Sequence, residues 1–271
     1  MPPHWARQSI GNKPSSSPPI QRLARVVIVH LTLVPLPCTT RLALNMSTYL
    51  PCIEINSGPQ PSAAVIWLHG LGATGDDFAA IVPQLDLNRC PPIRFVFPHA
   101  PSMPVTINGG YVMPAWYDIL GTETQRREDE AGIRRSALAI AALIEREVER
   151  GISSQHIVLA GFSQGCAVAL HTGLRYPKRL AGLMALSGYL PLASSLAAEC
   201  SDINRTLPVF MAHGLSDPMI VLARAEASRD ALRSLGYGVL WHSYPMQHSV
   251  HPAEIADMGL FLQSLLAPVA P

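Results

Sequence analysis

One segment, Ile157-Val158-Leu159-Ala160-Gly161-Phe162-Ser163-Gln164-Gly165-Cys166-Ala167, places a Gly-x-Ser-x-Gly pattern between an apolar run and a run of small residues. The apolar run predicts a strand, and the small residues predict a helix. A serine on the sharp turn between them exposes its hydroxyl, and the flanking glycines let the strand and the helix pass closely. The helix N-terminus also directs N–H groups toward developing negative charge. We therefore predict that Ser163 is a nucleophile rather than an idle turn residue.

Short apolar runs alternate with longer helical patterns from about residue 63 onward. Strands are predicted at Ala63–Leu68, Ile93–Phe97, Ile157–Ala160, Leu180–Leu186, Val209–Ala212 and Val239–Ser243. Helices are predicted at Asp76–Leu85, Asp129–Arg150, Ala167–Leu174, Ala223–Leu235 and Ile255–Leu266. Apolar strands separated by helices imply a mostly parallel central sheet with helices on both faces. Together with the serine turn, this predicts the α/β class and an α/β-hydrolase fold.

Length and composition fit one compact domain with an extension at one end. The chain has 271 residues, 48% of them apolar and 14% charged. We expect the domain to span residues 46–271, and residues 1–45 to be a disordered leader or to lie upstream of a true start at Met46. The net charge of +1 gives no electrostatic support for binding nucleic acid. The five cysteines are scattered without CxxC pairs, which favours buried thiols in a reducing compartment over disulfides or a zinc site.

No apolar run reaches the roughly 18 residues that span a bilayer. Val26–Leu36, preceded by Arg22 and Arg25, is similar to a secretory signal, but the segment 38–41 lacks a small-x-small cleavage pattern. We therefore expect no integral membrane span and a cytoplasmic location, with export through residues 1–45 as the alternative.

A serine nucleophile needs a base, which comes last along the chain in α/β hydrolases. The histidines after Ser163 are His171, His213, His242, His248 and His251. The first lies in a predicted helix, and the next two lie in or just after predicted strands. His248 follows the last predicted strand in a loop and is our choice as the base. His251 shares that loop and stays the rival.

The acid that orients the base should lie between the serine and the histidine. Asp217 follows the predicted strand Val209–Ala212, so its carboxylate lies at the edge of the sheet where such folds keep their sites. Asp202 precedes that strand and Asp230 lies on a predicted helix, which makes both weaker candidates. The structural alternative is that Asp217 merely caps the turn before Pro218.

Two backbone donors should stabilise the oxyanion that forms during acyl transfer. The Gln164 N–H follows the nucleophile and is the first. The loop His69-Gly70-Leu71-Gly72 follows an early strand, and the Leu71 N–H is our choice for the second. We expect His69 to shape this loop by hydrogen bonding rather than to act directly.

The segment 100–120 has no periodicity and is predicted to be a long functional loop. Its apolar side chains suggest a rim that binds an acyl group, with Trp116 the most expected to touch substrate and Met113 and Ile107 beside it. The alternative is that these side chains simply pack under the loop.

The motifs of this sequence resemble those of the acyl-protein thioesterase/carboxylesterase family, also called the phospholipase/carboxylesterase group. The resemblance covers about Met46 to Leu266 and rests on the motifs His69-Gly70-Leu71-Gly72, Gly75-Asp76-Asp77-Phe78, Phe97-Pro98-His99-Ala100-Pro101, Met113-Pro114-Ala115-Trp116-Tyr117-Asp118, Glu128-Asp129-Glu130-Ala131-Gly132-Ile133, Gly161-Phe162-Ser163-Gln164-Gly165, His213-Gly214 with Asp217-Pro218, and Met246-x-His248-Ser249. The rim version Asn108-Gly109-Gly110-Tyr111 is similar to that of bacterial carboxylesterases. Cys166 departs from the glycine or alanine usual in the family.

The resemblance implies a triad of Ser163, Asp217 and His248, an oxyanion hole from the Leu71 and Gln164 N–H groups, and neither a cofactor nor a metal. The expected activity is hydrolysis of short- to medium-chain carboxylic esters through an acyl-enzyme, with a small-molecule ester or acyl thioester as the partner. Acyl-protein thioesterase or lysophospholipase activity is the alternative, and a non-catalytic acyl-binding protein is a further one. A homodimer is one option for the oligomeric state.

Overall fold

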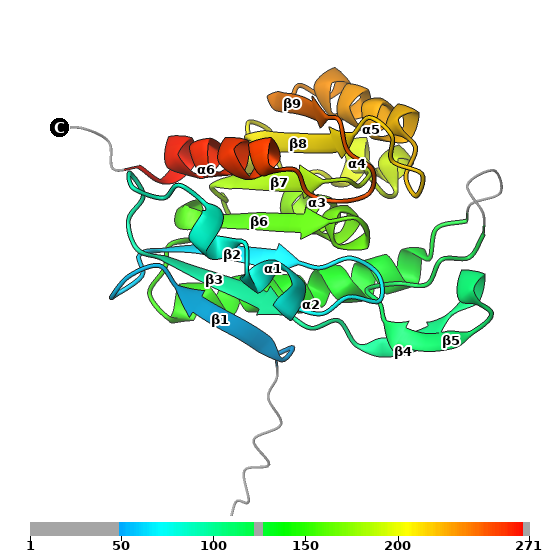
Figure 1. The fold of residues 1–271 in the computed structure, drawn as a ribbon, viewed down its shortest axis with the longest axis horizontal. Coiled ribbons are helices and arrows are strands. Elements are labelled where there is room, and N and C mark those ends of the chain that lie inside the picture. Colours follow the sequence, from blue (N-terminus) through cyan, green and yellow to red (C-terminus); the bar gives the residue numbers. More distant parts are fainter. Residues whose placement is uncertain (1–48, 122–126, 268–271) are drawn as a thin grey trace, which may run out of the picture. The chain divides into compact units, whose positions relative to one another are not determined.

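The computed structural model describes residues 49–121 and 127–267. Within them, seven strands form the central sheet in the order β1-β3-β2-β6-β7-β8-β9 (Figure 1). These strands are β1 (Cys52–Asn56), β2 (Ala63–Leu68), β3 (Ile93–Pro98), β6 (Ile157–Phe162), β7 (Gly182–Leu186), β8 (Val209–Gly214) and β9 (Val239–Tyr244). In this sheet β1 runs antiparallel to β3, and the other neighbouring strands run parallel. The predicted mostly parallel sheet is confirmed, and the expected leader of residues 1–45 lies outside the described residues.

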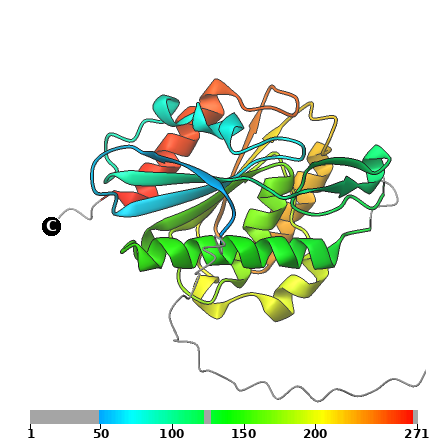
Figure 2. The same ribbon diagram turned by 90° about the horizontal axis from the view of Figure 1, so that it is seen from below.

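Helices cover both faces of the sheet, as the sequence predicts (Figure 2). They are α1 (Asp76–Ala79), α2 (Glu130–Glu149), α3 (Gln164–Arg175), α4 (Ala193–Glu199), α5 (Leu222–Ser234) and α6 (Pro252–Leu266). Alternate residues of β2 explain why both faces need cover: Ile66 and Leu68 pack toward α2 and α3, whereas Val65 and Trp67 pack toward α1 and α6. All six residues of β2 are buried, which is why its sequence is apolar throughout rather than alternating.

The long helix α2 agrees closely with its prediction, whereas α1 is much shorter than expected. The Asp129 side chain caps α2 by accepting a hydrogen bond from the Gly132 N–H (2.9 Å), and Gly151 follows its end with a φ of +95°. The predicted helix Asp76–Leu85 was wrong, because α1 ends at Ala79 and a separate 3-10 turn begins at Val82. Pro83 has no N–H and would clash with the preceding helical turn, so one continuous helix cannot form there.

The segment 100–120 contains a hairpin where the sequence predicted an irregular loop. Strands β4 (Ser102–Val105) and β5 (Tyr111–Pro114) pair antiparallel outside the central sheet. Gly109 and Gly110, with φ of +66° and +80°, form the end of the turn that joins the two strands. These two glycines were the available signal for a hairpin. Pro104 and Pro114 made the strands hard to recognise, because proline cannot donate to a ladder.

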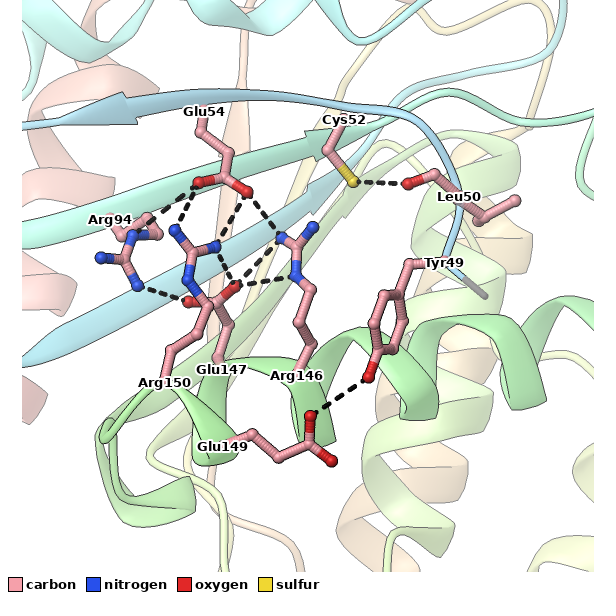
Figure 3. Close-up of polar contacts among 9 residues, drawn as sticks. All are labelled: Tyr49, Leu50, Cys52, Glu54, Arg94, Arg146, Glu147, Glu149 and Arg150. Atoms are coloured by element: carbon pink, nitrogen blue, oxygen red, sulfur yellow. Dashed lines mark hydrogen bonds and ion pairs between the residues drawn. The ribbon is translucent and has the colours of Figure 1, made fainter. Parts of the chain in front are cut away.

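Paired charges fasten the first strand to the end of α2 (Figure 3). Glu147 on α2 is fully buried, and its carboxylate lies 2.9 Å from Nη1 of Arg94 on β3. Glu54 on β1 lies 2.9 Å from both Arg146 and Arg150. Two carboxylates and three guanidinium groups therefore neutralise most of one another's charge, as buried charges require. The cluster lies at the opposite end of the strands from Ser163 and holds β1 at the edge of the sheet.

None of the helices within residues 49–121 and 127–267 is long and apolar enough to cross a bilayer. All four cysteines in these ranges are free thiols. Cys166 is buried and the other three are half-buried, so the expectation of buried thiols holds for Cys166 alone.

Candidate active site

Ser163 is the single residue between the end of β6 and the start of α3. Its φ of 56° and ψ of −117° are rare for a residue with a side chain, and such strain persists only where the surroundings hold it. The Ser163 N–H donates to the Leu186 carbonyl on the neighbouring strand β7 (2.9 Å). This bond fixes the turn that presents the Ser163 hydroxyl.

The two glycines of the motif are required by close backbone contacts. A Cβ on Gly161 would lie 2.3 Å from the carbonyl oxygen of Gly165. A Cβ on Gly165 would lie 2.5 Å from the carbonyl oxygens of Leu68 and His69. Neither position has space for a larger residue, so α3 starts directly against β2 and β6.

His248 is the histidine that reaches the serine. Its Nε2 lies 2.8 Å from Ser163 Oγ, and it follows β9 in the loop where the sequence placed the base. His251, the rival, lies at the N-cap of α6, where its Nδ1 accepts a hydrogen bond from the Ala253 N–H (3.1 Å). The structure therefore brings His248, and not His251, into contact with Ser163.

Asp217 completes the contact from the loop after β8. Its Oδ2 lies 2.7 Å from His248 Nδ1, and the residue is buried. Its Oδ1 accepts hydrogen bonds from the N–H groups of Met219 (2.8 Å) and Ile220 (3.0 Å). The carboxylate is held at both oxygens and points at the imidazole. The turn-capping alternative is thus also present in the structure, because the same side chain does both.

The weaker acid candidates lie elsewhere. Asp202 is in a 3-10 turn and pairs with Arg205 (3.1 Å). Asp230 is on α5 and pairs with Arg229 (2.8 Å). Neither has a contact with His248 among the described residues.

Sequence reasoning missed one residue at this site, His213. It is fully buried near the end of β8, its Nε2 donates to the Ile220 carbonyl (2.8 Å), and the same nitrogen lies 3.4 Å from Asp217 Oδ2. Burial lowers the pKa of His213. Its position four residues before Asp217 could have indicated a contact with the acid. The predicted strand was used only to reject His213 as the base.

The loop after β2 is held by His69 as a structural element. Its Nδ1–H donates to the Gly70 carbonyl (2.7 Å), and its Nε2 accepts from the Ala100 N–H (3.0 Å). Burial lowers the pKa of His69, which keeps the ring neutral as these two bonds require. Leu71 in this loop lies with Gln164 on the wall of the same cavity as Ser163.

The side chain of Trp116 does not line the cavity. Instead, Trp116 is hydrogen-bonded to Gln164 and His69 beside the site. Its backbone N–H donates to Gln164 Oε1 (2.8 Å), and its indole N–H donates to the His69 carbonyl (2.8 Å). Only 3% of its surface is exposed. Trp116, Met113 and Ile107 are all outside the cavity lining. For Trp116 the packing alternative describes the structure, because the indole is used to join two backbone segments.

A cavity of about 590 Å³ opens around Ser163 and His248. Its walls are mainly apolar and come from α1, the 3-10 turn after it, the end of β6, the start of α3, α6 and the loops after β2, β5, β7, β8 and β9. The side chains on these walls include Phe78, Ile81, Tyr117, Ile119, Phe162, Tyr189, Met219, Ile220, Val250 and Ile255. Its size lies within the range of small-molecule sites, and its lining suits an apolar group.

Cys166, the departure from the family pattern, lies in the first turn of α3. Burial raises the pKa of its thiol to about 12, so the thiol stays neutral and is a poor nucleophile. A Cβ on Gly188 would lie 2.4 Å from its sulfur. Cys166 is therefore a packed side chain and does not compete with Ser163.

A serine turn after a central parallel strand, with the histidine and the acid on later loops at the carboxyl ends of the strands, is the arrangement of the α/β hydrolases. The fold and the site place the chain in that class. Residues 50–266 match the family model described as phospholipase/carboxylesterase, and the chain belongs to that family.

Its relatives include acyl-protein thioesterases from fungi. The chain is 41% identical over 229 residues to acyl-protein thioesterase 1 of Neurospora crassa, covering 81% of this chain and 94% of that protein. It is 43% identical over 183 residues to acyl-protein thioesterase 1 of Schizosaccharomyces pombe, covering 68% and 81%. The crystal structure of Zea mays acyl-protein thioesterase 2 superposes with a TM-score of 0.72 at 30% identity, covering 80% of this chain and all of that one. The chain is therefore a hydrolase acting on esters or thioesters.

Proposed function

We propose that the enzyme cleaves short- to medium-chain carboxylic esters through an acyl-enzyme on Ser163. The observation that carries this proposal is the unbroken contact from Ser163 Oγ through both nitrogens of His248 to Asp217 Oδ2, at 2.8 and 2.7 Å. A serine hydroxyl is a weak nucleophile unless a neighbouring base removes its proton. This contact supplies the base together with the acid that orients it.

The reaction then has two steps. His248 removes the proton of Ser163 as the oxygen attacks the ester carbonyl, and it returns that proton to the leaving alcohol or thiol. Water, deprotonated by the same imidazole, attacks the acyl carbonyl, the bond to Ser163 Oγ breaks, and the imidazolium returns its proton to Oγ as the carboxylic acid leaves. Asp217 holds the imidazole in the required tautomer and stabilises the imidazolium.

The oxyanion hole in this proposal consists of the Leu71 and Gln164 N–H groups. Both residues line the cavity beside Ser163, and Gln164 is the first residue of α3. N–H groups at a helix N-terminus lack helical partners and favour negative charge. Each donor is expected to contribute about 3 kcal/mol to stabilising the transition state.

Acyl-protein thioesterase activity is the second candidate, favoured by the names of the relatives at about 40% identity. The same nucleophile and base serve a thioester, since only the leaving atom changes from oxygen to sulfur. A lysophospholipid is a third substrate class for the apolar cavity. The alternative of a non-catalytic acyl-binding protein is wrong, because the family and the thioesterase relatives make the chain a hydrolase.

Hydrolysis assays on the purified chain test the proposal. p-Nitrophenyl esters of two to twelve carbons, an acyl thioester and a lysophospholipid should be compared side by side for the wild type and Ser163→Ala. We expect Ser163→Ala to lower kcat by about 10⁶ for every substrate cleaved, with an unchanged circular dichroism spectrum. Ser234→Ala on α5 is the matched control and should keep full activity. Near-normal hydrolysis by Ser163→Ala would refute the assignment.

A cytoplasmic location also remains our proposal. The free thiols of the described cysteines support it, because secreted proteins commonly pair theirs. Mass spectrometry of the native N-terminus, with fractionation of the cells, would test this location directly.

A further inference from the structure

A second imidazole lies against the carboxylate of Asp217. His213 Nε2 is 2.8 Å from the Ile220 carbonyl oxygen and 3.4 Å from Asp217 Oδ2. Because both neighbours only accept hydrogen bonds, Nε2 must carry the proton. Asp217 Oδ2 therefore lies between two imidazole N–H groups, a close one from His248 and a longer one from His213.

The His213 ring is kept neutral by its surroundings. Its Nδ1 is buried and has no hydrogen-bond partner in the described part of the chain. Protonating Nδ1 would bury an N–H that has no acceptor among the described residues, and burial accordingly lowers the pKa of His213. The charged groups that act on it are Asp217, His248 and Glu226 on α5. A neutral ring presents a fixed N–H dipole to Asp217 and leaves the positive charge to His248.

His213 also closes the loop that carries the acid. The Ile220 N–H donates to Asp217 Oδ1 (3.0 Å), while the Ile220 carbonyl accepts from His213 Nε2 (2.8 Å). The N–H of Ile220 is thus held by Asp217, and its carbonyl is held by His213 near the end of β8. Ile220 itself lines the cavity, so the same contacts set the acid and part of the wall.

We propose that His213 is a positioning residue for the hydrolysis, holding the Asp217 loop through Nε2–H and drawing part of the carboxylate's negative charge away from His248. This inference rests on the proposed function, because it assigns His213 a role through Asp217 and His248. His213 touches no substrate in this account.

The expected effect of losing the Nε2–H donor has a definite sign. Without it, the charge on Asp217 Oδ2 acts more fully on His248 and stabilises the imidazolium. The acid limb of the kcat/KM profile then moves to higher pH, because the imidazolium is favoured and the base must be unprotonated to act. The loosened loop also misplaces the carboxylate, which lowers kcat at every pH.

Two substitutions of His213 by amide side chains of different length distinguish this role from simple packing. In His213→Gln the amide nitrogen is as many bonds from Cα as Nε2 is, so it can still donate to the Ile220 carbonyl. In His213→Asn the amide is one bond shorter and cannot reach. His171→Asn on α3 is the matched control, since His171 is another buried histidine whose Nδ1 has no hydrogen-bond partner within residues 49–121 and 127–267.

The readout is the pH profile of kcat/KM on a short p-nitrophenyl ester. We expect His213→Asn to move the acid limb of this profile to higher pH by about half a pH unit and to lower the plateau of kcat/KM by about 10- to 100-fold. His213→Gln and His171→Asn should keep both near the wild-type values. An acid limb that does not move in folded His213→Asn would overturn the inference, whatever happens to the plateau.

The wild-type protein provides a test that needs no variant. Nitrogen-15 NMR at pH 7 should show His213 neutral, with its proton on Nε2. A His213 that is charged at pH 7, or that carries its proton on Nδ1, would overturn the inference. Because this NMR readout does not depend on turnover, it separates failure of the inference from failure of the proposed function, which Ser163→Ala tests.

Discussion

The side chain of Gln164 binds the backbone of Trp116, with the amide oxygen accepting the Trp116 N–H at 2.8 Å. The amide nitrogen of Gln164 donates to the next carbonyl, that of Tyr117, at 2.7 Å. Gln164 also follows the nucleophile, and its own N–H is the proposed oxyanion donor. One residue therefore joins the serine turn to the segment that carries Tyr117 on the cavity wall.

Removing this side chain should cost both stability and activity. In Gln164→Ala the Trp116 N–H and the Tyr117 carbonyl lose their partners in a buried place, and each orphaned group costs about 1–3 kcal/mol. We expect a lower free energy of unfolding in urea and a reduced kcat, although the donor N–H itself remains. Gln155→Ala, at an exposed position, is the control. Wild-type stability and kcat in Gln164→Ala would contradict this coupling.

A methyl group at Gly165 should disrupt the site. Its Cβ would lie 2.5 Å from the carbonyl oxygens of two residues of the β2 end, and backbone atoms there cannot move aside. We predict that Gly165→Ala lowers the free energy of unfolding by about 1–3 kcal/mol or more and abolishes hydrolysis. Gly238→Ala, where a Cβ meets nothing within 4 Å, should behave like the wild type. An active, stable Gly165→Ala enzyme would show that the serine turn is looser than described.

Exchanging the acid for its amide should affect chemistry and spare the fold. Asp217→Asn keeps an oxygen that can accept the Met219 and Ile220 N–H groups, but its NH₂ would face His248 Nδ1 and favour the wrong tautomer. We expect kcat to fall by about 10⁴, as for a triad that loses its carboxylate. Thermal unfolding measured beside the kinetics should shift little. A kcat within tenfold of the wild type would remove Asp217 from the mechanism.

Glu254 should make stability depend on pH. It is fully buried near the start of α6, and burial raises the pKa of its carboxyl to about 7. A raised pKa means that the folded state holds the proton more tightly than the unfolded chain. The stability from this group is therefore full below about pH 4.5 and is lost as pH rises through about 7.

Glu254→Gln removes this titration while an amide oxygen can still accept the His251 N–H. Relative to the wild type, the variant should gain about 2 kcal/mol in free energy of unfolding between pH 5 and pH 8. Burial lowers the pKa of His171 to about 4, so its contribution is lost as pH falls from 6.5 toward 4. Both chains contain His171, so its effect cancels in the difference. A difference that is constant with pH would mean that Glu254 is ionised throughout.

Most strands of the sheet, and the residues Ser163, Asp217 and His248, could be predicted because their signals lie in short stretches of sequence. Strands buried on both faces must be apolar throughout, and a serine turn with later acid and base positions constrains where the other two lie. Side-chain direction does not follow from such patterns. The indole of Trp116 turns away from the cavity because its N–H donates to the His69 carbonyl, and His213 reaches Ile220 only because the loop folds back. The hairpin of residues 102–114 likewise depends on pairing partners that lie outside each local pattern, from Val105 with Tyr111 to Ser102 with Pro114.

The most direct test of the account is covalent labelling of the wild-type protein with a fluorophosphonate, followed by peptide mapping with mass spectrometry. We predict one label per chain, on the peptide that contains Ser163, and its loss in Ser163→Ala. A folded wild-type protein that takes no label, or a label that persists in Ser163→Ala, would contradict the claim that Ser163 is the activated nucleophile.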